Sequence, residues 1–166
     1  MAVPIENIPA EMRWKEATKG LTGACTAMMN ALKEAVGEEK FSQFQVALWS
    51  EAGKGAKELA DNLGLTVENP KDVEEVTQLL AVIGMGPEFE FEIVEATEEK
   101  SVGRATKCCW YERLKELGLK EDLCTSGHQG WGDGATESLN PKFTFNLTKN
   151  MARGDPYCEW VIERKK

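Results

Sequence analysis

The residues best suited to chemistry lie in the last third of the chain, between Cys108 and Cys158. This stretch holds four of the five cysteines and the only histidine. We expect Cys108 at the start of a helix, where the helix dipole and free backbone N–H groups lower the pKa of a thiol. Cys124 and His128 are four residues apart, close enough to contact one ion. Cys158 is expected on a strand with its side chain pointing inward, so three separate elements could converge on one point.

Thiolates and a neutral imidazole are ligands of zinc, ferrous iron and iron–sulfur clusters. We therefore predict a metal ion, zinc or iron, or an iron–sulfur cluster, bound by Cys108, Cys124, His128 and Cys158. The spacing does not repeat a C-x-x-C pair, so two alternatives stay open. One is a thiol-based active site without metal, with Cys108 or Cys109 as the nucleophile and His128 as base or acid. In the other, the cysteines are purely structural and His128 is exposed to solvent.

Other residues near these cysteines could complete a site. Trp131 could close over a bound small molecule or anchor its segment in the core, and we predict Trp131 and Trp110 as substrate-binding residues. Asp155 is expected to serve a turn, but it could also orient a ligand or water, so His128 and Asp155 are the catalytic candidates. The glycines of residues 127–134 do not follow a strand in a G-x-G-x-x-G arrangement. We predict a flexible lid or a close-packed turn there, within a loop, instead of a phosphate-binding loop.

Length and composition limit the class of protein. A chain of 166 residues with 42% apolar residues can bury a core as one domain. The formal charge of −8 argues against a nucleic-acid partner, which needs a basic surface. No segment has the apolar length to span a bilayer, and residues 1–11 lack the basic start and apolar core of a signal peptide. We therefore expect a cytoplasmic protein with reduced cysteines and no membrane partner.

Apolar residues at helical spacing predict helices in the first half of the chain. An arm over residues 1–20 is expected to pack loosely or against a partner subunit. One helix is predicted over 21–36 and a second over 41–63. In the second helix Gly53 and Gly55 indicate the close approach of another backbone or of a ligand, and packing is the simpler reason.

A third helix is predicted to begin at Asn69 as its N-cap, with Pro70 in the first position. The predicted buried faces of the three helices are, in order, Leu21, Cys25, Met28, Met29, Leu32 and Val36; Phe41, Phe44, Leu48, Ala52, Leu59 and Leu63; and Val73, Val76, Leu79, Leu80 and Ile83.

Alternating apolar and polar residues predict strands in the second half, with a helix from Trp110 to Leu117 between them. The predicted strands are 88–93, 101–107, 143–147 and 158–162. The fold class is therefore α+β, with N-terminal helices packed on a small, mostly antiparallel sheet with an inserted helix. We predict one domain, 1–166, with a helical half at 1–86 and a mixed half at 87–166 that carries the Cys/His site. Uncovered strand edges invite pairing, so a homodimer is an expected assembly.

The motifs of the second half resemble the L-2-amino-thiazoline-4-carboxylic acid hydrolase-like family. The residues that carry the resemblance are Cys108-Cys109-Trp110, Leu117-Gly118-Leu119, Cys124, Leu139-Asn140-Pro141 and Gly154-Asp155-Pro156-Tyr157-Cys158-Glu159. The Gly-Asp-x-x-Cys turn is also similar to the end of 4-vinyl reductase domains, which implies an α/β domain that binds small hydrophobic ligands, in some cases with a cysteine-ligated zinc. The chain departs from these patterns at Cys109, where the family often has proline, and at Asn150, which stands near the place of one zinc cysteine.

The resemblance implies hydrolytic opening of a thiazoline ring to give an S-carbamoyl cysteine. A bound metal would lower the pKa of water to about 7 and deliver hydroxide to the amidine carbon. Two functions are thus predicted: a metal-dependent hydrolase of a C–N bond in a small cyclic amidine, or a non-catalytic metal- or iron–sulfur-containing sensor or accessory protein that binds a small molecule. A polar pocket with an open coordination position favours the enzyme. A closed cysteine-rich site with an apolar pocket favours the binding protein.

Overall fold

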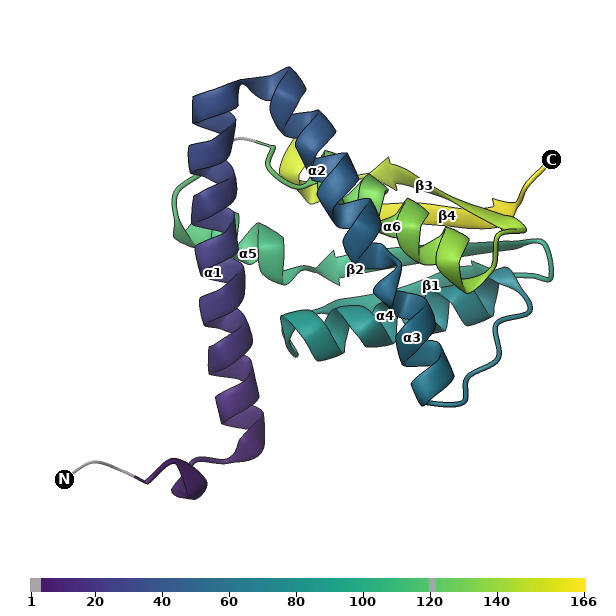
Figure 1. Ribbon diagram of the computed structural model, residues 1–166, viewed down its shortest axis with the longest axis horizontal. Coiled ribbons are helices and arrows are strands. Elements are labelled where there is room, and N and C mark those ends of the chain that lie inside the picture. The colour runs from purple at the N-terminus through teal and green to yellow at the C-terminus, as the bar shows by residue number, and fades with distance from the viewer. Residues whose placement is uncertain (1–3, 120–121) are drawn as a thin grey trace.

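Two long helices joined by a sharp turn begin the structure, a computed structural model that describes residues 4–119 and 122–166. α1 (Ala10–Val36) and α2 (Glu38–Gly53) form an open hairpin (Figure 1). The chain turns at Gly37, whose φ of 79° lies in the region that favours glycine. The predicted arm is therefore wrong from Ala10 onward, because that part belongs to α1. A short 3-10 turn, η1 (Ile5–Asn7), precedes it, and the first three residues of the arm lie outside the described part.

α1 buries a different face from the one predicted. Its buried residues are Thr18, Thr22 and Thr26, whereas Leu21 is 55% and Met28 71% exposed. Each threonine hydroxyl donates to the carbonyl four residues earlier at 2.8 Å, so the hydroxyls are buried without losing a partner. Small side chains on this face let α1 approach its neighbours closely, which the apolar spacing alone did not indicate.

The predicted helix over 41–63 is two helices, α2 and α3 (Gly55–Asn62), separated at Lys54. The expected close approach is confirmed at Gly53, because a Cβ there would collide with the backbone at Trp131 and Ala135. That backbone belongs to α6 (Thr125–Leu139), which replaces the predicted loop.

The glycines of α6 explain why this helix was not predicted. Each glycine lowers helix propensity by about 1 kcal/mol relative to alanine. In the fold Gly130 and Gly134 lie against the backbone of α2, where a Cβ on Gly130 would be only 2.7 Å from the carbonyl oxygen of Val46, and one on Gly134 would collide with the carbonyl of Ser50. The glycines therefore let the two helix backbones touch, which agrees with the close packing predicted for this segment but not with a loop.

α4 (Pro70–Met85) begins as predicted, with a reciprocal cap. The Asp72 N–H donates to Asn69 Oδ1 at 3.1 Å, and the Asn69 N–H donates to Asp72 Oδ2 at 3.2 Å. Its buried face is rotated from the predicted one, since Leu79 and Ile83 are exposed. The buried residues of α4 are Pro70, Val73, Glu74, Val76, Thr77 and Ala81.

A four-stranded antiparallel sheet forms the second half, in the order β1-β2-β4-β3. The strands are β1 (Glu90–Ala96), β2 (Lys100–Lys107), β3 (Phe143–Lys149) and β4 (Cys158–Arg164). The inserted helix is α5 (Cys109–Glu116), between β2 and α6, and the predicted fold class is confirmed. None of the described helices has the length and apolarity needed to cross a membrane.

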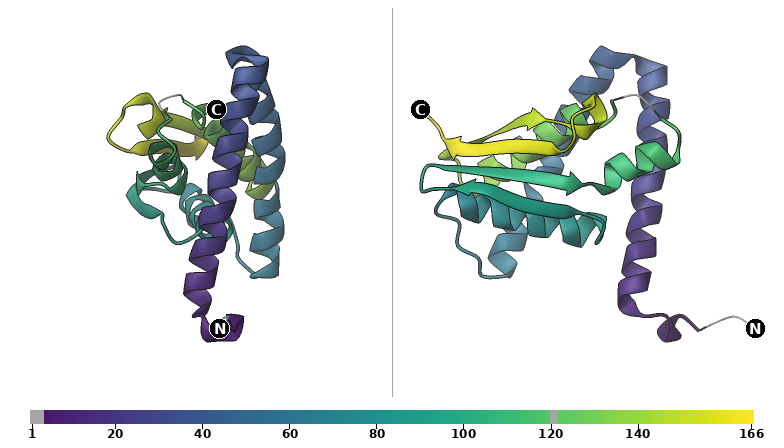
Figure 2. Two further views of the ribbon diagram at one scale, coloured as in Figure 1. Left: turned by 90° about the vertical axis from the view of Figure 1, so that its left-hand side faces the viewer. Right: turned by 180° about the vertical axis from the view of Figure 1, so that it is seen from behind.

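Helices cover one face of the sheet and leave the other open. α4 and α6 lie on the covered face, α2 packs on the far side of α6, and α1 stands at the end of the sheet beside α5 (Figures 1 and 2). Side chains on the covered face of the sheet form the main core together with residues of α3, α4 and α6. Its largest members are Val73, Val76, Leu139, Phe143, Phe145, Met151, Trp160 and Ile162.

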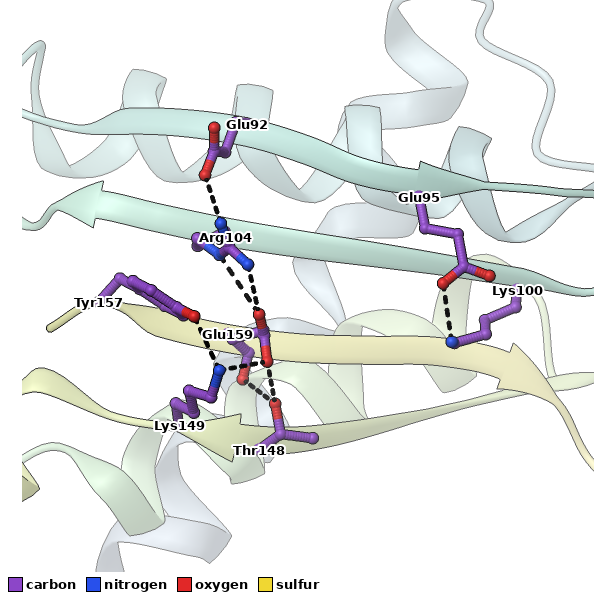
Figure 3. Close-up of polar contacts among 8 residues, drawn as sticks. All are labelled: Glu92, Glu95, Lys100, Arg104, Thr148, Lys149, Tyr157 and Glu159. Atoms are coloured by element: carbon purple, nitrogen blue, oxygen red, sulfur yellow. Dashed lines mark hydrogen bonds and ion pairs between the residues drawn. The ribbon is translucent and has the colours of Figure 1, made fainter. Parts of the chain in front are cut away.

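The open face of the sheet carries a network of charges (Figure 3). The Arg104 guanidinium contacts Glu92 at 3.0 Å and Glu159 at 2.8 Å, and it lies 4.0 Å from the centre of the Tyr157 ring. Lys149 contacts Glu159 at 3.2 Å and donates to the Tyr157 hydroxyl at 2.8 Å. Arg104 lowers the pKa of Glu159 through its hydrogen bonds, with a smaller effect from Lys149. Glu159 thus lies on the opposite face of β4 from the buried Cys158 and Trp160.

Candidate functional site

A pocket lies on the covered face of the sheet, between α4, α5, α6 and the strands, with a cavity volume of about 100 Å³. A single water molecule needs about 10–15 Å³ by this kind of measure, so the pocket has room for a small organic molecule. Its walls are mainly aromatic and aliphatic. They include four of the five tryptophans: Trp49, Trp110, Trp131 and Trp160. No Lys, Arg, Asp or Glu lines the pocket in the described part of the chain.

Aromatic rings form one continuous wall around Trp160. The Phe91 ring meets Trp160 edge-on, with centroids 6.2 Å apart, and Phe145 stacks on it at 6.4 Å. The imidazole of His128 lies 5.4 Å from the Trp160 ring and 5.8 Å from the Phe145 ring. Rings in such edge-on and offset arrangements hold one another in place, so this wall is well defined in shape.

All four predicted metal ligands line this one pocket, from three regions of the chain. Cys108 is the N-cap of α5, Cys124 is the N-cap of α6, His128 lies in the first turns of α6, and Cys158 begins β4. The three elements therefore bring these side chains to one pocket, as predicted.

The thiols of Cys124 and Cys158 contact Asn150 and Met151. The Cys124 thiol lies 3.9 Å from Asn150 Oδ1, and the Met151 N–H donates to Cys158 Sγ at 3.5 Å. Within residues 4–119 and 122–166, no group of three or more His, Cys, Asp or Glu side chains is placed to hold a metal ion. The observed arrangement does not fit a metal ion without rearrangement. The zinc or iron prediction stays a prediction.

The thiols differ in acidity. The Cys109 thiol lowers the pKa of Cys108 by donating to it, and the backbone N–H groups of Tyr111 and Trp110 at the start of α5 add to this against the effect of burial. Burial raises the pKa of Cys158 to about 12 and that of Cys124 well above its usual value. Cys108 is therefore the thiol best suited to act as a thiolate in the pocket.

His128 is a neutral base in the pocket wall. Burial lowers the pKa of its imidazole to about 4, so the ring is uncharged at neutral pH. The imidazole has no hydrogen-bond partner among the described residues, although its backbone N–H bonds to Cys124. Both ring nitrogens are thus available to a ligand. The alternative of a solvent-exposed loop histidine is wrong, since His128 lies in a helix and its side chain is half-buried in the pocket wall.

The remaining predicted residues divide into two groups. Trp131 and Trp110 line the pocket, and the Trp110 indole N–H donates to Met85 Sδ at 2.9 Å. Asp155 does not line the pocket, and its carboxylate accepts the Asn150 N–H at 2.8 Å within the turn before β4. Asp155 therefore positions the residue next to Cys124, and its proposed contact with a ligand or water stays a prediction.

Three residues that were not among the predicted site residues also belong to the site. Glu74 is fully buried beneath the pocket and accepts hydrogen bonds from Trp160 Nε1 at 2.7 Å and Gln78 Nε2 at 2.6 Å. Gln78 lines the pocket, one turn further along α4. Asn150 also lines it, and its buried Nδ2 has no partner among the described residues. A signal for Glu74 was the small and polar spacing of Glu74, Thr77, Gln78 and Ala81 on one side of α4.

Solved structures of other proteins share the fold. The phenol-responsive sensory domain of the transcription activator PoxR, solved with phenol, is 15% identical and matches with a TM-score of 0.65, covering 86% of this chain and 74% of that one. Trafficking protein particle complex subunit 3 from Naegleria fowleri, covalently bound to palmitic acid, is 12% identical and matches with a TM-score of 0.65, covering 90% and 96%. These neighbours are consistent with the fold expected from the resemblance to 4-vinyl reductase domains. No curated protein sequence matches the chain.

The sequence also matches one family model over residues 19–161, most of the chain and both of its halves. The match includes every cysteine and the histidine that line the pocket. The chain therefore belongs to the L-2-amino-thiazoline-4-carboxylic acid hydrolase family.

Proposed function

We propose that the chain binds a small, mostly apolar molecule in the pocket between α4, α5, α6 and the sheet. The observation that carries this proposal is the lining, which is aromatic and aliphatic and includes no charged carboxylate or cation among the described residues. Burying a charged ligand without a partner is costly, whereas an aromatic or aliphatic ligand gains from each surface it buries. An apolar pocket of this kind favours a binding protein over an enzyme.

The ligands of two structural neighbours support the same chemistry. Phenol and palmitic acid, which are named with those structures, are both molecules with a large apolar part and one polar end. In this chain the polar end would meet Gln78, His128 or Asn150, the uncharged polar groups of the lining. A few such groups in an apolar pocket fix the orientation of a ligand.

Binding can be tested with phenol, indole and hexanol as probes, by calorimetry and by tryptophan fluorescence, since four tryptophans line the pocket. Ala81 is buried on α4 at the pocket wall, so Ala81→Leu should fill part of the cavity and weaken binding. The exposed Ala47 on α2 gives the matched control, Ala47→Leu. Failure of all three probes to bind the wild-type protein at millimolar concentration would overturn the proposal.

A second candidate function is the hydrolysis of a C–N bond in a small cyclic amidine. Family membership and the acidic thiol of Cys108 in the pocket favour it. The Cys108 thiolate would attack the amidine carbon, the ring C–N bond would break with the proton going to the ring nitrogen, and water would then release the carbamoyl product and restore the thiol. His128, as a neutral base, would take the proton from that water.

The hydrolase can be tested with L-2-amino-thiazoline-4-carboxylate. Turnover to S-carbamoyl cysteine that Cys108→Ser abolishes, with the fold retained, would establish it. Elemental analysis of the same preparation tests the predicted zinc or iron, which Cys108, Cys124 and Cys158 would hold. Sedimentation analysis tests the predicted homodimer.

A further inference from the structure

The carboxylate of Glu74, which lies behind the pocket lining, forms a hydrogen-bonded pair with the amide of Gln78, which lines the pocket. One carboxylate oxygen, Oε1, accepts from Gln78 Nε2 at 2.6 Å, and the other, Oε2, accepts from the Trp160 indole at 2.7 Å. Gly103 on β2 leaves room for this pair, because a Cβ there would collide with both Glu74 and Trp160. In this arrangement each oxygen of Glu74 accepts one hydrogen bond, as an ionised carboxylate does.

Protonation of Glu74 requires a different arrangement. A neutral carboxyl group carries an O–H that must find an acceptor, because an unpaired buried donor is costly. The Trp160 indole can only donate, so it cannot serve as that acceptor. Of the two residues that bond to the carboxyl group, only Gln78 has an acceptor, its Oε1. That atom reaches Glu74 when the amide turns by half a rotation, a change that exchanges its oxygen and nitrogen.

We propose that Glu74 and Gln78 act as a proton-linked switch of pocket polarity. With Glu74 ionised, Gln78 donates to it and presents its amide oxygen, an acceptor, to the ligand. With Glu74 neutral, Gln78 accepts from it and presents its NH2 group, a donor. This inference rests on the proposed function, since it concerns the ligand of the same pocket.

The switch operates near neutral pH because burial raises the pKa of Glu74 to about 7, against the lowering effect of its two hydrogen bonds. No charged side chain contributes to that shift. The elements packed on α4 present few titratable groups to the pocket: β1, β2 and α1 line it with Phe91, Ala105 and Met29.

The other titratable groups of the lining are the imidazole from α6, the thiols of Cys108, Cys124 and Cys158, and the Tyr111 phenol from α5. His128 stays neutral above pH about 4, and Cys124 and Cys158 stay protonated at neutral pH. Cys108 is the one group whose lowered pKa could add a second pH dependence, and the experiment must separate it from Glu74.

The switch changes which class of ligand binds best. At a pH above the pKa of Glu74, the amide oxygen of Gln78 favours a ligand with a hydroxyl donor, such as a phenol. At a pH below this pKa, the NH2 group of Gln78 favours a ligand with only a carbonyl acceptor, such as an aryl ketone. One neutral hydrogen bond contributes about 0.5–1.5 kcal/mol, so the ratio of the two affinities should change roughly two- to tenfold.

Phenol and acetophenone are suitable probes, because both stay uncharged between about pH 5.5 and about pH 8.5. Calorimetric titrations of the wild-type protein should give an affinity ratio of phenol to acetophenone that rises about two- to tenfold with pH across this range. Binding of both probes with a ratio that does not change with pH would overturn the switch and leave the proposed function standing. Binding of neither probe at any pH would also overturn the switch, and it would reject the proposed function as well only if indole and hexanol fail to bind too.

Variants assign the pH dependence to a residue. In Glu74→Gln the new amide accepts from Trp160 and donates to Gln78, which holds Gln78 in the donor-presenting orientation at every pH. The ratio should then stay at its low-pH value. Gln78→Met removes the amide and should flatten the ratio even if Glu74→Gln does not fold. Glu75→Gln, an exposed neighbour paired with Lys71 at 3.1 Å, is the matched control and should behave as wild type. A pH-dependent ratio that persists in both Glu74→Gln and Gln78→Met would assign it to another group, such as Cys108, and overturn the proposal.

Discussion

The indole N–H of Trp160 donates to the Glu74 carboxylate at 2.7 Å, across a separation of 86 positions in the sequence. This contact joins α4 to the central strand β4 and places a carboxyl group in the interior, where it is fully buried. Its ionisation therefore affects the stability of the whole fold.

The pKa of Glu74 is raised from 4.5 to about 7, so the folded state binds the proton more tightly than the unfolded chain does. The contribution of the protonated Glu74 carboxyl group to the free energy of unfolding is complete below pH about 4.5 and is lost as pH rises through about 7. A shift of this size corresponds to roughly 3 kcal/mol. Urea unfolding of wild type and Glu74→Gln should show the variant gaining in relative stability over this window. A difference in free energy of unfolding that is constant with pH would contradict the prediction.

The contribution of His128 to the stability of the fold should depend on pH in the opposite direction, and it should be lost as pH falls. Burial lowers its pKa from 6.5 to about 4, so its contribution is complete above pH about 6.5 and is lost as pH falls through about 4. The magnitude is again roughly 3 kcal/mol. The His128→Leu variant has no imidazole to protonate and does not lose this stability in acid. It should therefore resist acid unfolding better than the wild-type protein does. Unfolding curves of the two proteins that fall in parallel between pH about 6.5 and about 4 would show that the imidazole is not neutral and buried.

Cys108 should react with iodoacetamide at a lower pH than an ordinary thiol, whose midpoint is about 8.5. Peptide mapping by mass spectrometry after timed alkylation gives the midpoint for each cysteine. The Cys109 thiol is the largest cause of the lowered pKa, so Cys109→Ala should move the midpoint of Cys108 upward. Cys109→Ser keeps a donor and should move it less. Equal midpoints in the two variants would mean that the donor has no role.

The contact between α2 and α6 should not tolerate a side chain. Gly130→Ala places a Cβ 2.7 Å from the Val46 carbonyl oxygen, and we expect a loss of roughly 1–3 kcal/mol in stability. Gly20 on α1 is exposed, and no atom lies within 4 Å of the position that a Cβ would take there, so Gly20→Ala should stabilise by about 0.5–1 kcal/mol. Chemical denaturation of the two variants provides the comparison, and a stabilising Gly130→Ala would show that the two helices can separate freely.

The sequence was most informative where local patterns decide the structure. The alternation of Cys158, Trp160 and Ile162 predicted their inward direction, and Asn69 with Pro70 predicted the start of α4. It was least informative where distant contacts decide. The glycines of α6 disfavour a helix locally, and contacts with distant segments compensate for them: Gly130 and Gly134 meet the backbone of α2, and Gly132 meets the Phe145 ring. A carboxylate such as Glu74 is expected to be exposed on a helix, and its burial depends on Trp160, far along the chain.

The backbone contact between α2 and α6 divides the pocket into a stiff side and an adaptable side. Where Gly130 and Gly134 meet the backbone of α2, no layer of side chains lies between the two helices, so this part of α6 has little room to shift for a wider ligand. Met29 and Met85 line other parts of the pocket. Unbranched methionine side chains change shape at little cost. Differences in ligand size must therefore be absorbed along α1 and the end of α4, and it is there that substitutions should broaden or narrow the range of accepted molecules.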